Sequence, residues 1–290
     1  MPELPEVETV KTALSNLAKG LTILDVVIAR RDLRKEIPAN FEDKVKGGTI
    51  KNIDRRGKYI LIHLDSGYGI CPHLRMSGVI GFQKDNKDYS PGLHDHLQMR
   101  LDNGDIFVFT DPRRFGQVFH YNQTKEDLAE IFGHMGPEPL SDDFSPSYLS
   151  KALSNRRGPV KNALMDQKIV AGLGNIYVCE ALFEARISPR RKAYTIKGNR
   201  ARKLVSAIRN VLNRAIKAGG TTLRDYRQVN GQMGYFQHSF SVYDRQGRPC
   251  PGCICEAKQN SLEDNLLNKT GIHRMVQAGR STFFCPKRQR

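Results

Sequence analysis

The sequence predicts an α+β protein in three parts: a leading helix with a β-sandwich, a helical domain and a C-terminal β-hairpin. Three observations carry this prediction. Short segments rich in β-branched and aromatic residues, punctuated by Gly, Asp and Asn, continue to about residue 125, which is typical of a sandwich or barrel. Apolar residues then recur at helical spacing as far as the Gly219-Gly220 pair. The last 50 residues return to short strands around four cysteines.

The size and composition fit a globular protein of about two domains. The chain has 290 residues, of which 39% are hydrophobic and 26% charged. No stretch approaches the ~18 uncharged apolar residues of a membrane span, and the acidic N-terminal segment is unlike a signal peptide. We therefore expect no membrane partner and a monomeric protein. The excess of 46 Lys and Arg over 30 Asp and Glu gives a net charge of +16, which indicates a polyanionic partner.

The first part of the chain is expected to span residues 1–130. Apolar residues at helical spacing predict a helix near the N-terminus, and Gly20 is expected to end it. Strands are expected at TILDVVIAR, YILIHLDSG, LQMRLDNGD and IFVFTD. The stretch GHMGPEPLSDD combines Gly, Pro and acids without periodicity, which predicts a linker over residues 131–145.

Helices are expected over residues 146–240, and a hairpin module over residues 241–290. Ser145 and Pro146 predict the first helix start, because Ser caps helices and Pro suits the first helical position. The sequence GLGN interrupts the helical pattern further on, and a long helix is expected to end at the double glycine.

The six cysteines fall into two classes. Cys71 and Cys179 lie alone in apolar segments and are expected to be small buried hydrophobes. The other four lie within the last 41 residues, at positions 250, 253, 255 and 285. With no secretion signal, this clustering predicts a metal site before a disulfide. It also indicates a reducing compartment, most simply the cytoplasm.

The N-terminal Met-Pro-Glu has the chemistry of an amine catalyst. Removal of the initiator methionine would expose Pro2 as a secondary amine, and an α-amino group has a pKa of about 7.7–8.0, well below that of lysine. Such an amine attacks a sugar carbonyl carbon and forms a cationic iminium, which is a strong electron sink. Glu3 could protonate the opening sugar ring as a general acid. A flexible terminus without function is the alternative interpretation of these residues.

The opening MPELPEVETV resembles that of the formamidopyrimidine-DNA glycosylase family, bifunctional enzymes that excise oxidised purines and cut the DNA strand. The resemblance covers nearly the whole chain, because DRRGKY, HLRMSG, HDH, TDPRRFG, GPEPLSDDF, LMDQKIVAGLGNIY, GGTTLRDY and GRSTFFC follow in the family's order. It implies a helix–two-turns–helix motif in the helical domain and a C-terminal β-hairpin zinc finger. The implied partner is duplex DNA that carries an oxidised base or an abasic site.

The resemblance also implies the catalytic residues. Pro2 would be the Schiff-base nucleophile and Glu3 the proton donor, with Glu6 as a supporting carboxylate. Lys58 would donate a proton in β-elimination. Arg280 would do so in δ-elimination and would clamp a phosphate, for which a planar guanidinium is suited. On residue type alone, Lys58 could equally be a solvated or phosphate-contacting cation.

The implied DNA contacts are of two kinds. Extrusion of the damaged nucleotide leaves a void, and Met76, Arg113 and Phe115 resemble the family's void-filling triad. Without the resemblance, the Met and Phe would be interpreted as core residues. The remaining implied contacts are polar or cationic: His73, His94, Arg156, Lys161 and Asn175.

Two glycine-rich loops have implied roles. Asn175 follows GLG at a helix N-terminus, where close backbone approach and free N–H groups favour a phosphate. An ordinary turn between helices, with the Asn as a cap, is the alternative. The stretch RDYRQVNGQMGYFQ is expected to cover the everted lesion, as its counterpart does in the family.

The predicted zinc finger departs from the family pattern of two CxxC pairs. Cys250 and Cys253 supply the first pair and Cys285 the third ligand, but Arg288 stands in the fourth position. The spacer of 31 residues between Cys253 and Cys285 is long and polar, and its extra piece is expected to be a solvent loop. Three explanations stay open. Cys255 or His273 completes the site for Zn²⁺, water does so, or the hairpin folds without metal.

Two other functions remain as alternatives. The sister enzymes of the endonuclease VIII type excise oxidised pyrimidines, and they typically have Gly where this chain has Leu4. A damaged-DNA-binding protein that has lost its chemistry is the other, motivated by the altered finger. The retained Pro2, Glu3, Lys58 and Arg280 argue against it, because binding alone needs no proline amine beside a carboxylate.

Overall fold

The computed structural model describes residues 1–84, 89–222, 229, 231–253 and 271–290. They form two compact units. The first comprises residues 1–134 and 215–237, and the second comprises residues 135–214 and 238–290. The chain therefore crosses between the units three times, and each unit combines segments that are distant in the sequence.

The first unit contains two four-stranded antiparallel sheets, which confirms the predicted β-sandwich. In spatial order, one sheet consists of β1 (Ile23–Ile28), β6 (Asp95–Leu101), β7 (Ile106–Thr110) and β5 (Val79–Gln83). The other consists of β2 (Ile50–Arg56), β3 (Tyr59–Leu64), β4 (Tyr68–His73) and β8 (Gln117–Asn122). Apolar side chains from both sheets, such as Met99 and Ile62, meet in a single buried cluster.

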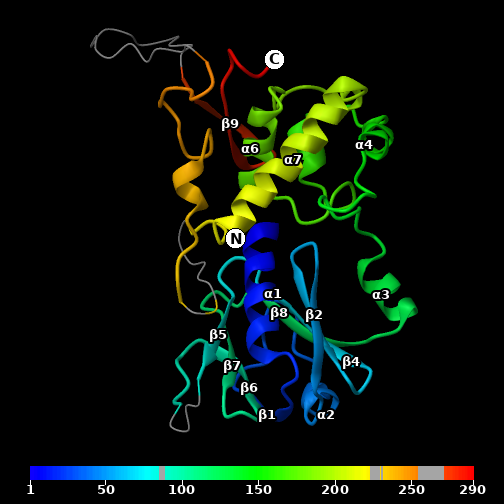
Figure 1. Ribbon diagram of the computed structural model, residues 1–290, viewed down its shortest axis with the longest axis vertical. Coiled ribbons are helices and arrows are strands. Elements are labelled where there is room, and N and C mark those ends of the chain that lie inside the picture. The colour runs from blue at the N-terminus through cyan, green and yellow to red at the C-terminus, as the bar shows by residue number, and fades with distance from the viewer. Residues whose placement is uncertain (85–88, 223–228, 230, 254–270) are drawn as a thin grey trace. The chain divides into compact units, whose positions relative to one another are not determined.

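The leading helix, α1 (Leu4–Ala18), packs against β2 and contributes to the same cluster. Figure 1 shows it (blue) lying lengthwise beside the strands of this unit. Glu3 and Glu6 form a capping box at its start, with proline in the first turn, so the motif that begins the sequence is also a strong helix start. Gly20 follows the helix with φ +88°, as expected for a residue that ends it.

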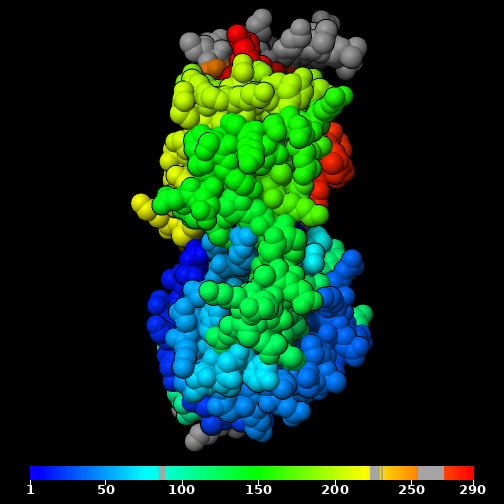
Figure 2. Space-filling model, turned by 90° about the vertical axis from the view of Figure 1, so that its right-hand side faces the viewer, coloured from blue at the N-terminus to red at the C-terminus, as the bar shows by residue number. Residues whose placement is uncertain are grey.

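Two short helices complete the described part of residues 1–134, namely α2 (Phe41–Val45) and α3 (Lys125–Phe132). The hydroxyl of Thr124 accepts a hydrogen bond from the main-chain N of Asp127 and so caps α3. Helix α3 packs against β8. In Figure 2, green atoms lie over blue and cyan atoms of this unit. Phe132 at its end contacts the ring of Tyr59 edge-on.

The second unit contains helices together with the C-terminal hairpin. Its helices are α4 (Pro146–Leu153), α5 (Val160–Leu164), α6 (Asn175–Glu184) and α7 (Asn199–Lys217), and the last residues of α7 belong to the first unit. The Ser145 hydroxyl accepts from Tyr148 N at 3.1 Å, which confirms the predicted start of α4. Short 3₁₀ turns lie at Ala193–Thr195 (η1) and Phe236–Ser239 (η2).

The C-terminal hairpin pairs β9 (His273–Gln277) with β10 (Arg280–Phe284) in antiparallel register. Strand β10 packs against α6. Cys71 and Cys179 are both buried and are not disulfide-bonded, and their burial is as predicted. Within the described part of the chain, no helix combines the length and the apolar character needed to cross a membrane.

Candidate active site and nucleic-acid interface

The N-terminal segment holds its carboxylates in a buried hydrogen-bond network. Pro2 and Glu3 precede α1, and Glu3 is only 3% exposed. The main-chain N of Glu3 donates to Glu6 Oε2 at 2.8 Å. The other oxygen of Glu6, Oε1, accepts from Thr221 N at 2.7 Å. Glu6 therefore fixes the residues around Pro2 to a segment more than 200 residues further along the chain.

Gly220 explains why the partner segment begins with a double glycine. It has φ +79°, and a Cβ there would lie 3.0 Å from Glu6 Oε1 and 3.2 Å from the Glu6 Cα. A side chain at this position would displace the carboxylate, so glycine is needed. The sequence analysis used this pair only as a helix stop and did not identify Thr221. The one feature of the sequence that could have pointed to Thr221 was its position in the family motif GGTTLRDY.

Lys58 and His73 form a second group in the same unit. Both are buried, Lys58 in the turn between β2 and β3 and His73 at the end of β4. Burial, together with the positive charges of Arg75 and Lys58, lowers the pKa of His73 to about 3. Its Nδ1 accepts from Arg75 N at 3.0 Å, which places the ring proton on Nε2. His73 can therefore offer a neutral N–H donor beside the Lys58 cation.

The predicted void-filling side chains lie at loop tips and not in the core. Met76 is 39% exposed and Phe115 is 37% exposed. The guanidinium of Arg113 lies over the Phe115 ring, 4.8 Å from its centroid. This exposure argues against the alternative interpretation of Met76 and Phe115 as core residues. Large exposed apolar side chains on a tight loop are typical of a surface that contacts a partner.

The HDH motif is part of the same unit. His94 is half-buried at the start of β6, and His96 is buried with its Nε2 2.8 Å from the Asp111 carbonyl oxygen. Neither histidine belongs to a potential metal-ligand group among the described residues, where such grouping is confined to three cysteines. The role of His94 as a DNA contact stays a prediction.

In the second unit, Lys161 and Asn175 both bind the hairpin. Lys161 is 1% exposed, and its Nζ donates to Thr282 Oγ1 at 2.7 Å and to the Ser281 carbonyl at 3.3 Å. Asn175 Nδ2 donates to the same carbonyl at 2.9 Å. These bonds fix β10 directly next to Arg280, which is exposed at the start of the strand. The structure thus brings three of the predicted DNA-contacting or catalytic residues together.

The loop before α6 is closed by a residue that the sequence analysis missed. Gln167 accepts from Gly172 N at 2.8 Å and donates to the Leu173 carbonyl at 2.9 Å. The extended Gly174 then precedes the helix. These bonds set the backbone of GLGN so that the first turn of α6 begins at Asn175. The position of the Gln within LMDQKIVAGLGNIY was the available signal.

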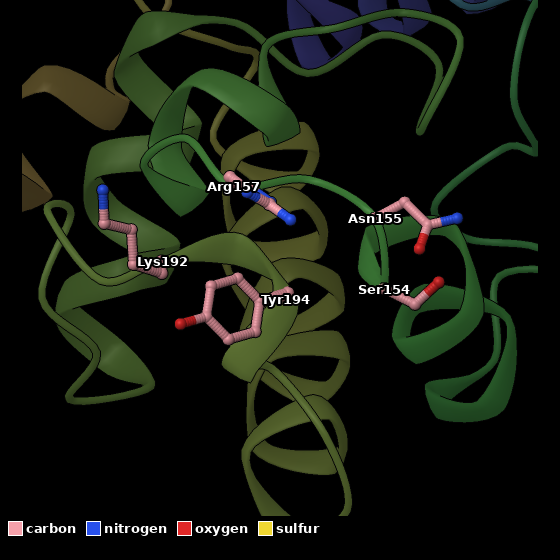
Figure 3. A pocket seen from close by; sticks show the side chains of 5 residues that line it. All are labelled: Ser154, Asn155, Arg157, Lys192 and Tyr194. Atoms are coloured by element: carbon pink, nitrogen blue, oxygen red, sulfur yellow. The ribbon is translucent and has the colours of Figure 1, made fainter.

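An open pocket of about 620 Å³ in this unit is lined by residues on both sides of Arg156 in the sequence (Figure 3). Arg156 is exposed and pairs with Asp166 at 3.3 Å, and its carbonyl accepts from Tyr194 N. The pocket is lined by Ser154, Asn155, Arg157, Lys192 and Tyr194. Two further cations therefore lie near Arg156, which concentrates positive charge at this loop.

Three cysteines of the hairpin module are brought together. The sulfur atoms of Cys250, Cys253 and Cys285 lie within 4.8 Å of one another, and the last two are 3.5 Å apart. His273 is not part of this group, and Cys255 lies outside the described residues, as does the polar spacer over residues 254–270. Apolar neighbours, among them Phe283, surround Cys250 and Cys285 in a small core.

Arg288 occupies the neighbourhood where the family has its fourth ligand. Its main-chain N lies 3.4 Å from Cys285 Sγ, and its guanidinium donates to the Gly252 carbonyl between the first two cysteines. The guanidinium also lies over the Phe183 ring, 4.9 Å from the centroid. Gln289 accepts from Cys285 N at 2.8 Å. Arg288 thus links the two cysteine-bearing turns without being a metal ligand.

Comparisons with known proteins cover the whole chain. Residues 1–118 match the family model of the formamidopyrimidine-DNA glycosylase N-terminal domain, and residues 135–227 match that of the formamidopyrimidine-DNA glycosylase H2TH domain. The chain is 46% identical over 290 residues to the formamidopyrimidine-DNA glycosylase of Rhodospirillum rubrum, with 100% of each covered. The chain belongs to the formamidopyrimidine-DNA glycosylase family.

Solved structures of this family share the fold. A complex between the Lactococcus lactis enzyme and DNA containing an abasic site has a TM-score of 0.85 and 29% identity, covering 99% of both chains. A structure of MutM in complex with DNA containing carbocyclic 8-oxo-G also has a TM-score of 0.85, with 30% identity and 100% of both chains covered. The resemblance predicted from the sequence motifs is therefore confirmed, together with the α+β fold class.

Proposed function

We propose that this chain excises oxidised purines, such as 8-oxoguanine and formamidopyrimidines, from duplex DNA and then cuts the strand at the abasic site. The observation that carries the proposal is the buried carboxylate network around Pro2, in which Glu6 fixes Glu3 and Thr221. The comparisons support it, because the curated relative is named a formamidopyrimidine-DNA glycosylase and the solved structures are complexes with abasic-site and carbocyclic 8-oxo-G DNA. We accordingly propose that the protein acts on DNA in the bacterial cytoplasm.

Pro2 is the proposed nucleophile. Once Met1 is removed, its secondary amine attacks C1′ of the damaged nucleotide, and the bond from C1′ to the base breaks. The base leaves with a proton, the sugar ring opens, and C1′ becomes doubly bonded to the nitrogen as an iminium. Glu3 donates the proton that the ring oxygen needs. Glu6 is a positioning residue, since it holds the main chain on which Pro2 and Glu3 sit.

The strand is then cut by two eliminations. The cationic iminium makes the C2′ hydrogen acidic, so loss of that proton expels the 3′ phosphate, and a second elimination expels the 5′ phosphate. Lys58 is the proposed proton donor for the first step. Arg280 is proposed to clamp a phosphate bidentately and to assist the second.

The remaining predicted residues are proposed to bind DNA. Met76, Arg113 and Phe115 fill the void that the extruded nucleotide leaves. The proposed contacts to the phosphate backbone are His73, His94, Arg156 and Asn175, whereas Lys161, at 1% exposure and bound to Thr282, is proposed to support them through the hairpin. The net charge of +16 provides additional affinity that is independent of base sequence and weakens with salt.

We also propose that the hairpin module binds one structural Zn²⁺ through Cys250, Cys253 and Cys285. A tetrahedral site with Zn–S bonds of about 2.3 Å needs sulfur atoms roughly 3.8 Å apart, and the three sulfurs within 4.8 Å of one another fit that requirement. Arginine cannot be a ligand, so Cys255 or water supplies the fourth. Bound zinc would cross-link the hairpin and take no part in the reaction. Zinc content should be measured on reduced protein, because the thiolate and not the disulfide form of cysteine binds the metal.

Borohydride trapping on a duplex with one 8-oxoguanine tests the central step, because borohydride reduces the iminium to a stable covalent adduct. Wild-type protein should give the adduct, and peptide mapping should locate it on Pro2. Pro2→Gly should lose most of the yield, whereas Pro91→Gly in an exposed loop should retain it. A full yield from Pro2→Gly would overturn the mechanism, and faster excision of thymine glycol than of 8-oxoguanine would favour the endonuclease VIII type.

A further inference from the structure

The two loops that carry the void-filling side chains share one buried carboxylate. Met76 lies between β4 and β5, and Arg113 and Phe115 lie between β7 and β8. Asp111 is 0% exposed and lies at the base of both loops. Its Oδ1 accepts from Ser77 Oγ at 2.5 Å, and its Oδ2 accepts from Gly116 N at 2.6 Å. The first bond reaches the residue after Met76, and the second reaches the residue after Phe115.

The same aspartate also fixes a third segment and the start of its own loop. Its main-chain N donates to the His94 carbonyl at 3.0 Å, and its carbonyl oxygen lies 2.8 Å from His96 Nε2. Arg113 N approaches Oδ1 at 3.3 Å. Because one buried side chain accepts bonds from both loops at once, these contacts hold the loop bases firmly.

The backbone around Asp111 requires this support. Arg75 and Arg114, one in each loop, have φ of +52° and +56°, a conformation that residues with a side chain adopt only where the surroundings hold them. A Cβ at Gly116 would lie 2.6 Å from the Phe109 ring and 2.9 Å from Asp111 Oδ2. Each of the two loops therefore contains one strained residue, and the backbone at Gly116 packs tightly against the Asp111 carboxylate.

We propose that Asp111 is a positioning residue that couples the Met76 loop to the Arg113–Phe115 loop, so that the three side chains enter the DNA stack as one wedge. This inference rests on the proposed function, in which these side chains fill the void. Loops that are already held together lose less conformational freedom on insertion, which favours the extruded state of the nucleotide. The hydroxyl of Ser77 is the direct link between the two loops.

Ser77→Ala tests the coupling, because it removes that link and leaves the charge of Asp111 in place. Single-turnover excision of 8-oxoguanine from a duplex should slow by about tenfold, the effect of one lost hydrogen bond of this kind. Strand cutting at an abasic site in single-stranded DNA, where no void has to be filled, should stay within about twofold of wild type. Ser66→Ala, in an exposed turn, is the matched control.

A double-mutant cycle separates coupling from simple loss of stability. In the wild-type background, Met76→Ala and Phe115→Ala together should slow duplex excision little more than either alone, since either one breaks the wedge. In the Ser77→Ala background the two effects should multiply. Asp111→Asn, whose amide cannot accept on both sides, should behave like Ser77→Ala.

The outcomes distinguish this inference from the function on which it rests. If Met76→Ala and Phe115→Ala each leave duplex excision unchanged, the wedge itself is wrong. If they slow it but Ser77→Ala does not, only the coupling by Asp111 is overturned. If Ser77→Ala slows duplex excision and single-stranded cutting equally, along with a lower melting temperature, Asp111 has a merely structural role and the inference also fails.

Discussion

Lys161 and Thr282 are 121 residues apart in the sequence, yet the Lys161 ammonium donates to the Thr282 hydroxyl at 2.7 Å in the interior of the second unit. Both side chains are buried. The bond joins α5 to β10 and so fixes the strand that begins with Arg280. Lys161, which the sequence suggests as a DNA contact, thus supports the hairpin that presents Arg280.

Removal of that acceptor should weaken the hairpin. Thr282→Val keeps the shape of the side chain but removes the hydroxyl that accepts from the buried Lys161 ammonium, so the free energy of unfolding in urea should fall by about 1–3 kcal/mol. Thr282→Ser keeps the hydroxyl and should lose less than half as much. Equal losses in the two variants would show that the methyl group, and not the hydrogen bond, matters.

Glu6→Gln should impair excision more than DNA binding. The amide can accept from only one of Glu3 N and Thr221 N, so one buried donor is left unpaired at a cost of about 2 kcal/mol. Single-turnover excision should fall by about thirtyfold, while the Kd for abasic-site DNA should change by less than about threefold. Glu126→Gln, at an exposed position in α3, is the control. A parallel loss of affinity would assign Glu6 to binding.

Local motifs made much of this fold predictable. The strand segment TILDVVIAR contains β1, and the cap at Ser145 starts a helix as its residue type requires. Such features depend on residues within a few positions of one another. The same is true of GLGN, where the first turn of α6 begins at the predicted Asn175.

The supporting contacts could not be predicted in this way. Glu6 meets Thr221 and Ser77 meets Asp111 only because the fold brings distant segments together. Periodicity also says nothing about whether an isolated cation is exposed, so the burial of Lys161 was not foreseeable. The replacement of a fourth cysteine by Arg288 was visible in the sequence, but its bond to Gly252 was not.

Arg288 should be needed for the stability of the cysteine module. Arg288→Ala removes the bond to the Gly252 carbonyl and the contact with the Phe183 ring, which should lower the free energy of unfolding by about 1–3 kcal/mol. Lys287→Ala, at the exposed neighbouring position, should have little effect. If Arg288→Ala is as stable as the control, the guanidinium does not link the two cysteine turns.

A cysteine at position 288 should strengthen metal binding. Arg288→Cys restores a thiolate where the family has its fourth ligand, and structural zinc prefers four protein ligands. Reduced Arg288→Cys protein should retain zinc at a chelator concentration at least about tenfold higher than wild type does. Zinc content by mass spectrometry of metals gives the readout. Equal retention would show that the wild-type site already has four strong ligands.

His73 should make the stability of the protein fall as the pH is lowered through the mildly acidic range. Its pKa of about 3 lies below the value of about 6.5 for an unfolded histidine, so between these values the unfolded chain binds the additional proton. Stability therefore rises with pH in this window by about 1.4 kcal/mol per unit, and the His73 contribution is complete above pH 6.5. Between pH 7 and pH 5 the wild-type protein should lose about 2 kcal/mol from this residue.

The variant that isolates this contribution is His73→Asn, because its carbonyl oxygen can accept the bond from Arg75 N but it has no proton to bind. Urea unfolding at pH 7 and pH 5 should show a loss on acidification smaller by about 2 kcal/mol than in wild type. His134→Asn, at an exposed position, should keep the wild-type dependence. An unchanged loss in His73→Asn would mean that burial does not lower the pKa of the imidazole in the folded protein, so that the ring would be a cation and not a neutral donor at pH 5.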